Sequence, residues 1–150
     1  KYVDLYLNNK WKVYEKINDR WEICVSSSDN NIFNHVSFVN GICTSKGGKH
    51  VDYICDQICD KIIKIMDKKK IKIKKNIIKN QLFIFVKCVI NNPSFDSQTK
   101  ETLTTDNTPA TFPIKFCIVD LTIGWLICHL STSKYCLTSL MHLSNTSLLL

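Results

Sequence analysis

Hydrophobic and polar residues alternate along the first third of the chain, which is the pattern of strands with one face against a core. Residues 11–17 and 21–26 follow this period of two, so we expect two half-buried strands there. Residues 35–43 form a third candidate strand, in which Gly41 indicates a bulge or a close backbone approach. Residues 82–90 form a nearly continuous apolar run, which is typical of a strand buried on both faces.

A helical period replaces the alternation after residue 50. The apolar residues on one face of this helix are Val51, Ile54, Cys55, Ile58, Cys59, Ile62 and Met66. The glycine pair Gly47–Gly48 precedes the helix, and we expect a turn that sets its start and lets another backbone approach closely. A phosphate-binding P-loop is not indicated, because the earlier glycine is absent and His50 follows Lys49.

The positive charge is concentrated in one segment. The net charge is +7, and residues 61–79 alone hold nine lysines and one aspartate. Like charges crowded over residues 68–75 predict an exposed loop. Such a patch attracts polyanions, and nucleic acid is the usual partner, while a merely solvated helix end explains the pattern equally well.

Other chemistry is sparse. The eight cysteines form no CxxC pair and lack zinc spacing, so we expect reduced thiols and no metal site. The four histidines lie in no triad pattern, and no catalytic residue is assigned. No uncharged apolar stretch of about 18 residues occurs, so we expect no membrane span. Lys100, in the polar loop 94–101, suits contact with a phosphate, although a surface lysine needs no such role.

Two long segments change this picture. Residues 36–53 (VSFVNGICTSKGGKHVDY) and residues 92–101 (NPSFDSQTKE) closely resemble eukaryotic DNA topoisomerase II. They are similar to its transducer domain, the second half of the ATPase region. Residues 1–6 (KYVDLY) and 20–24 (RWEIC) fit the same domain in the same order, so the resemblance covers residues 1–105.

The resemblance implies an α+β fold like domain 2 of ribosomal protein S5. It implies ATP binding, with Mg²⁺ in the complete enzyme, in a preceding GHKL domain that these residues do not include. The transducer would contribute Gln98, Thr99 and Lys100, the lysine contacting the γ-phosphate. Nucleotide state would then become domain rotation that closes a homodimeric gate on double-stranded DNA. Lys68, Lys69 and Lys70 match the family's DNA-contacting lysines, and the nucleus is the implied location.

Residues 106–150 do not resemble the family. They hold four charged residues and are rich in Leu, Ser and Thr. This composition break predicts a disordered or non-native tail on a fragmentary or mis-spliced gene product. The water-activating glutamate, the TOPRIM domain and the DNA-cleaving tyrosine are not among these residues, so we expect the 150 residues alone to be inactive. The alternative hypothesis is a small basic, non-enzymatic DNA-binding module, in which Lys100 would be irrelevant.

Overall fold

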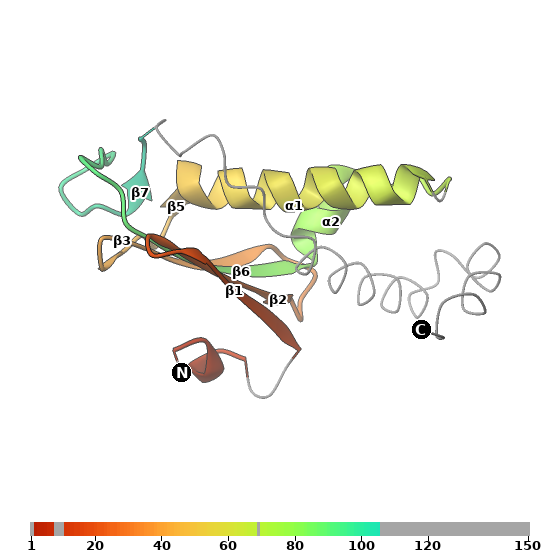
Figure 1. The fold of residues 1–150 in the computed structure, drawn as a ribbon, viewed down its shortest axis with the longest axis horizontal. Helices are drawn as coiled ribbons and strands as arrows, with labels where there is room; N and C mark the ends of the chain where they lie inside the picture. The colour runs from red at the N-terminus through yellow and green to blue at the C-terminus, as the bar shows by residue number, and fades with distance from the viewer. Residues whose placement is uncertain (1, 8–10, 69, 106–150) are drawn as a thin grey trace.

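The described part of the chain is built on one mixed sheet with a long helix across it. The computed structural model describes residues 2–7, 11–68 and 70–105. The order across the main sheet is β1 (Lys12–Asn18), β2 (Trp21–Ser27), β6 (Leu82–Cys88), β3 (Asn34–Val39) and β4 (Ile42–Cys43). Only β3 and β6 are parallel neighbours in this sheet. Helix α1 (Lys49–Lys68) crosses one face of the sheet (Figure 1).

The core lies between α1 and the sheet. The buried residues of α1 are His50, Val51, Ile54, Cys55, Ile58, Cys59, Ile62 and Met66. Ile23, Val25, Ile84 and Val86 of the sheet belong to the same buried cluster. The predicted helix and its apolar face are therefore confirmed, and their burial is the main favourable contribution to folding.

Strand β6 is central, as its apolar run predicts. It pairs antiparallel with β2 and parallel with β3, so neither of its edges is free. Ile84 and Val86 face α1, while Phe85 is buried on the opposite side of the sheet. Burial on both faces explains why this strand carries almost no polar residue.

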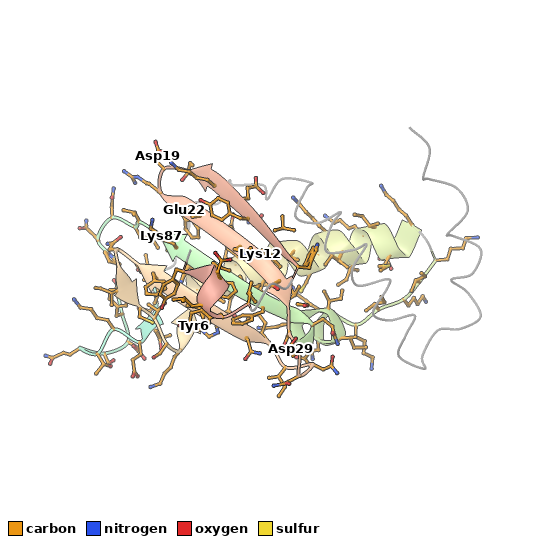
Figure 2. All side chains as sticks on the ribbon, turned by 90° about the horizontal axis from the view of Figure 1, so that it is seen from below. Tyr6, Lys12, Asp19, Glu22, Asp29 and Lys87 are labelled. Atoms are coloured by element: carbon orange, nitrogen blue, oxygen red, sulfur yellow. The ribbon has the colours of Figure 1, made fainter. Side chains whose placement is uncertain are left out.

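The sheet face opposite α1 is more covered than the alternation predicts. Cys24, expected on the polar face of a half-buried strand, is buried against Leu7 and Phe85. The cover is the N-terminal segment with its short helix η1 (Val3–Leu5), and Figure 2 shows Tyr6 of this segment over the sheet. The half-buried assignment of this strand was wrong because a segment outside it supplies a second layer.

The predicted strand 35–43 is in fact a hairpin. Asn40 and Gly41 have φ values of 52° and 82° and form the turn between β3 and β4. Positive φ at both central residues defines a two-residue hairpin turn. The bulge expected at Gly41 is thus corrected to a turn, and the dipeptide Asn-Gly was the signal for it.

The lysine-rich segment follows the end of α1. Residues 70–74 have no regular secondary structure, which confirms the predicted loop at these positions. Its predicted bounds, 68–75, are corrected, because Lys68 is the last residue of α1 and Lys75 begins the next helix. A short helix, α2 (Lys75–Asn80), comes next and was not expected, because six residues are too few to show a helical period. Ile78 of α2 is buried in the main core.

A second, two-stranded sheet joins distant parts of the chain. Strand β5 (Gly47–Gly48), directly before α1, pairs in parallel with β7 (Thr102–Leu103). Figure 1 shows both strands beside the first turn of α1. The expected tail, residues 106–150, lies outside the described residues, and so does Lys69.

The cysteines of the described segments are free thiols, as expected. Cys55 and Cys59 lie one helical turn apart, and their Sγ atoms are 4.0 Å from each other. Within the described residues no group of three or more His, Cys, Asp or Glu side chains is placed to hold a metal. No helix of the same segments is long and apolar enough to span a membrane.

Candidate functional site

The loop carrying Gln98, Thr99 and Lys100 is the tip of an irregular hairpin. At its base, Asp96 N–H donates to the Thr102 carbonyl at 3.2 Å, and Thr104 N–H donates to the Ser94 carbonyl at 2.9 Å. Residues 96–100 are all exposed, whereas Leu103 at the base is buried. The three predicted residues therefore project from an anchored stem.

Short-range hydrogen bonds shape the tip. Lys100 N–H donates to the Ser97 carbonyl at 3.1 Å, and the hydroxyl groups of Ser97 and Thr99 are 2.7 Å apart. Lys100 has a φ of 56°, in the left-handed region that closes tight turns. A non-glycine residue there is uncommon, and such positions cluster at functional sites.

Asp96 stabilises the stem through its carboxylate. The carboxylate accepts the Thr102 backbone N–H at 3.2 Å and the Ser97 hydroxyl at 3.3 Å. Hydrogen bonding from Thr102, followed by that from Ser97, holds the pKa of Asp96 below its usual value. The ionised side chain thus joins the two arms of the stem at its base.

The glycine pair holds this hairpin against α1. Gly47 and Gly48 have φ values of 77° and 126°. A Cβ on Gly48 would fall on the backbone of Leu103 in β7. The expected turn is present, since Gly47 N–H donates to the Thr44 carbonyl at 3.0 Å, and the expected close approach of a backbone is confirmed.

An ion pair between the residues that precede β5 and β7 lies next to Lys100. The Lys46 ammonium is 2.5 Å from the Glu101 carboxylate, and Lys46 N–H donates to the Glu101 carbonyl at 3.0 Å. The hydrogen bond to Glu101 raises the pKa of Lys46. Because Lys46 occupies the neighbouring carboxylate, Lys100 remains without an ion-pair partner among the residues described. Lys100 is thus an exposed cation on a fixed backbone.

The predicted DNA-contacting lysines lie at the other end of α1. Lys68 is the last residue of the helix, and Lys70 follows with a φ of 62°. Lys70 N–H donates to the Asp67 carbonyl at 2.9 Å, and Ile71 N–H donates to the Met66 carbonyl at 3.0 Å. These two bonds form the Schellman motif that commonly ends a helix.

The structure therefore does not bring the two predicted sets together. The helix between them has 20 residues, and at 1.5 Å per residue it is about 30 Å long. Figure 1 shows β5 and β7 at one end of α1 and the lysine-rich loop at the other. One rigid element thus connects the two.

The described histidines are not placed for catalysis. His50 is fully buried, with Nε2 3.2 Å from the Thr44 hydroxyl, and burial lowers its pKa to about 4. Burial also lowers the pKa of His35. A neutral, buried imidazole at the start of α1 is a packing group.

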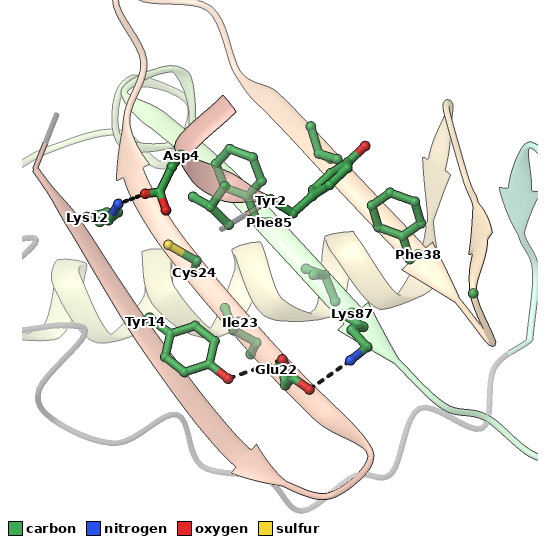
Figure 3. A pocket seen from close by; sticks show the side chains of 14 residues that line it. Tyr2, Asp4, Lys12, Tyr14, Glu22, Ile23, Cys24, Phe38, Phe85 and Lys87 are labelled. Carbon is green, nitrogen blue, oxygen red and sulfur yellow. Dashed lines mark hydrogen bonds and ion pairs between the residues drawn. The ribbon is translucent and has the colours of Figure 1, made fainter. Parts of the chain in front are cut away.

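A cavity that the sequence did not indicate lies on the sheet face opposite α1 (Figure 3). Its volume is about 560 Å³, and its walls include Tyr2, Phe38 and Phe85. At one rim, Glu22 accepts hydrogen bonds from the Tyr14 hydroxyl at 3.1 Å and from Lys87 at 2.9 Å. The sequence feature that could have indicated this cavity is the set of aromatic residues at strand positions that face away from the main core. The cavity is on the other side of the sheet from the Lys100 stem.

Together these features define a mixed α/β domain with an exposed lysine loop fastened to the start of a long helix. The DNA gyrase B family matches residues 1–113, and the chain belongs to that family. The resemblance to eukaryotic DNA topoisomerase II is confirmed by curated relatives. DNA topoisomerase 2 of Arabidopsis thaliana is 51% identical and DNA topoisomerase 2-alpha of Cricetulus griseus 46% identical, each over 114 residues and 69% of this chain.

A solved structure agrees with the fold. The ATPase region of Saccharomyces cerevisiae topoisomerase II is similar with a TM-score of 0.74 and 43% identity. The match covers 82% of this chain and 33% of that one. The chain spans only 7% of the length of the hamster relative and 8% of the Arabidopsis one.

Proposed function

We propose that this chain is part of an ATP-dependent type II DNA topoisomerase, which couples ATP binding and hydrolysis to passage of one DNA duplex through another. Residues 1–105 would be the transducer, with the fold of domain 2 of ribosomal protein S5, and residues 106–150 would lie outside it. The observation that carries the proposal is the exposed Lys100 on its anchored stem, which has no ion-pair partner in the described segments, in a chain similar to a topoisomerase ATPase region.

Lys100 would contact the terminal phosphate of ATP and thereby distinguish ATP from ADP. The nucleotide, with Mg²⁺, would be held by another part of the protein, and Gln98 and Thr99 would donate further hydrogen bonds to it. ATP carries more negative charge than ADP at this end, so an ammonium group placed there binds the triphosphate more strongly. The left-handed backbone at Lys100 holds the base of the side chain in place before the nucleotide arrives.

The stem would transmit movement from the nucleotide-binding loop to the lysines that contact DNA. The strand pair of Gly48 with Leu103 ties the loop to the first residue of α1. A displacement of the loop would therefore move the helix as a rigid body, and rigid-body motion of this kind is a common form of switching. Lys68, Lys69 and Lys70 at the far end would contact backbone phosphates of the transported duplex, without sequence preference.

The complete enzyme would act as a homodimer that closes on double-stranded DNA in the nucleus. Support comes from the names of the relatives, each a DNA topoisomerase 2 of a eukaryote. The alternative, a small basic module that binds DNA without enzymatic activity, is favoured only by the lysine-rich segment. It leaves the anchored Lys100 loop without a role.

A chimera tests the proposal. Residues 1–105 would replace their counterpart in yeast topoisomerase II, and the chimera would be compared with its Lys100→Ala variant. Removing one preorganised charge from a phosphate in the transition state should lower ATP turnover by roughly 100-fold. Strand passage should fall with it. Lys16→Ala, at an exposed lysine paired with Asp19, is the matched control and should be neutral.

The outcomes separate the two hypotheses. An active chimera that is unaffected by Lys100→Ala contradicts the proposed role of the loop. If Lys100→Ala is neutral and Lys68→Gln/Lys70→Gln alone abolishes DNA binding, the non-enzymatic module is the better description. The purified chain of 150 residues should show no ATP turnover by itself, and turnover would contradict the assignment as a part.

A further inference from the structure

Two thiols of helix α1 meet inside the main core. Cys55 and Cys59 lie one helical turn apart, and the 4.0 Å between their Sγ atoms is the one thiol–thiol contact among the described residues. Both side chains are fully buried. Cys24 and Cys88 are also buried, but they lie on opposite faces of the sheet. The helix therefore holds two sulfur atoms side by side, a feature that the proposed function does not use.

A direct bond between these two sulfur atoms does not suit the helix. Residues four apart on a helix have Cβ atoms about 5–6 Å from each other, whereas a disulfide requires about 3.5–4.5 Å. Formation of a disulfide would therefore distort the backbone of α1. An atom inserted between the two sulfur atoms removes this restriction, because each sulfur then bonds to the bridging atom instead.

The number of donors limits which atom could form such a bridge. Structural zinc takes four ligands, and within the described residues no group of three or more His, Cys, Asp or Glu side chains is placed to hold a metal. Two thiolates alone suit a soft centre that needs only two sulfur ligands. Trivalent arsenic in an organoarsenical meets this condition, since its third bond is already made to carbon.

We infer that Cys55 and Cys59 form a binding site for trivalent organoarsenicals, in which one arsenic atom bridges the two sulfur atoms. With phenylarsine oxide, the arsenic–oxygen bonding is replaced by two arsenic–sulfur bonds. The two thiol protons leave with the oxide oxygen as one molecule of water. Arsenic stays trivalent, so the step needs no oxidant or reductant. The site is independent of the proposed function, because it requires neither nucleotide nor DNA.

The surroundings of the pair favour loss of the first proton. The hydrogen bond shared with Cys59 lowers the pKa of Cys55 against the opposing effect of burial, and the charge of Lys79 acts in the same direction as the hydrogen bond. The thiolate is the form of cysteine that attacks and binds such centres. A single buried thiol lacks this help, and burial raises the pKa of Cys88 to about 12.

Helix α2 is the element that would open to admit the arsenical. It packs on the acidic residues of α1 next to the two cysteines, with Lys75 2.9 Å from Asp56 and Lys79 3.6 Å from Asp52. Exposed ion pairs contribute little to stability. Ile78 is the one buried residue of this six-residue helix, which is too short to be stable by itself. We therefore expect α2 to open locally while the sheet stays closed.

The test uses the full chain, treated with phenylarsine oxide under native conditions and then digested with trypsin. The tryptic peptide 50–61 contains Cys55 and Cys59 and no other cysteine, so mass spectrometry separates this site from the cysteines at 117, 128 and 136, which lie outside the described residues. We expect one arsenical per peptide. The adduct should survive an excess of mercaptoethanol, a monothiol, and should be removed by dimercaptopropanol, a dithiol.

Variants distinguish a bridge from two independent thiols. The second bond forms at a high effective concentration, so Cys55→Ala or Cys59→Ala should lower retention of the arsenical by roughly 100-fold or more. Cys88→Ala is the matched control, because it also removes one buried thiol but leaves the pair intact. Thermal melts establish that each variant is folded. If an alanine variant unfolds, Cys55→Val or Cys59→Val, which keeps the position filled and apolar, replaces it.

Retention by the unmodified chain and by Cys88→Ala, with loss in both variants of the pair, supports the site. Release of the arsenical by mercaptoethanol, or equal retention by Cys55→Ala, would mean that the thiols react singly and would overturn it. Recovery of peptide 50–61 as an internal disulfide, lighter by two hydrogen atoms, would also overturn it. The same holds if peptide 50–61 stays unmodified in a folded chain whose exposed Cys43 has reacted.

Discussion

Replacement of Gly48 by alanine should detach the Lys100 stem from helix α1. Gly48 has a φ of 126°, a conformation open almost only to glycine, and a Cβ there would collide with the backbone of Leu103. The collision is with main chain, which cannot rotate away as a side chain can. The β5–β7 pairing must therefore open.

The expected cost follows from these two effects. Strain at such a φ costs about 1–3 kcal/mol, and each lost backbone hydrogen bond costs about 1 kcal/mol. We therefore expect Gly48→Ala to lower the free energy of unfolding by roughly 3 kcal/mol. For a domain of about 100 residues, each 1 kcal/mol corresponds to about 4–8 °C in Tm.

Gly41→Ala is the matched control. Gly41 also has a positive φ, 82°, but a Cβ there would meet no atom within 4 Å. Its replacement should cost only the strain of a left-handed alanine, about 1–2 kcal/mol. The difference between the thermal melts of the two variants thus reports the contact with Leu103 together with the greater strain at the φ of Gly48.

Trypsin provides a local readout. Cleavage after Lys100, detected by mass spectrometry under native conditions, should be faster in Gly48→Ala than in Gly41→Ala, because only the former releases the stem. Equal losses of stability together with equal cleavage rates would refute the view that the glycine pair anchors the loop.

Two further predictions concern buried groups. Burial lowers the pKa of His50 from 6.5 to about 4, so the unfolded chain binds a proton that the folded chain does not. The contribution of His50 to the free energy of unfolding should be fully present above pH 6.5, and it should fall by about 3 kcal/mol as the pH drops to 4. Denaturant titrations should show a weaker pH dependence of this free energy in His50→Gln. An unchanged pH dependence would contradict the burial of a neutral His50. Burial also raises the pKa of Cys24 to about 11 and of Cys88 to about 12. Alkylation of the folded protein at pH 8, mapped by mass spectrometry, should therefore modify the exposed Cys43 well before these two. Labelling of all three cysteines at one rate would contradict the burial of Cys24 and Cys88.

The sequence by itself determined the elements whose signals are local. The apolar face of α1 follows from a period visible between Val51 and Met66, and the central position of β6 follows from its continuous apolar run. The resemblance to topoisomerase II likewise depends only on residue order in two segments. Such features need no knowledge of what lies opposite in space.

Contacts between distant segments were decided by the tertiary structure. Gly48 meets Leu103, and Lys75 meets Asp56 and Asp60, only because the chain turns back on itself. Counting charges in the sequence does not distinguish between the lysines of residues 61–79. Packing of α2 on α1 pairs some of them with aspartates and leaves others exposed. Periodicity reports which face of an element is buried. Which partner covers it, and which charges are thereby paired, depends on interactions between residues that the sequence does not place side by side.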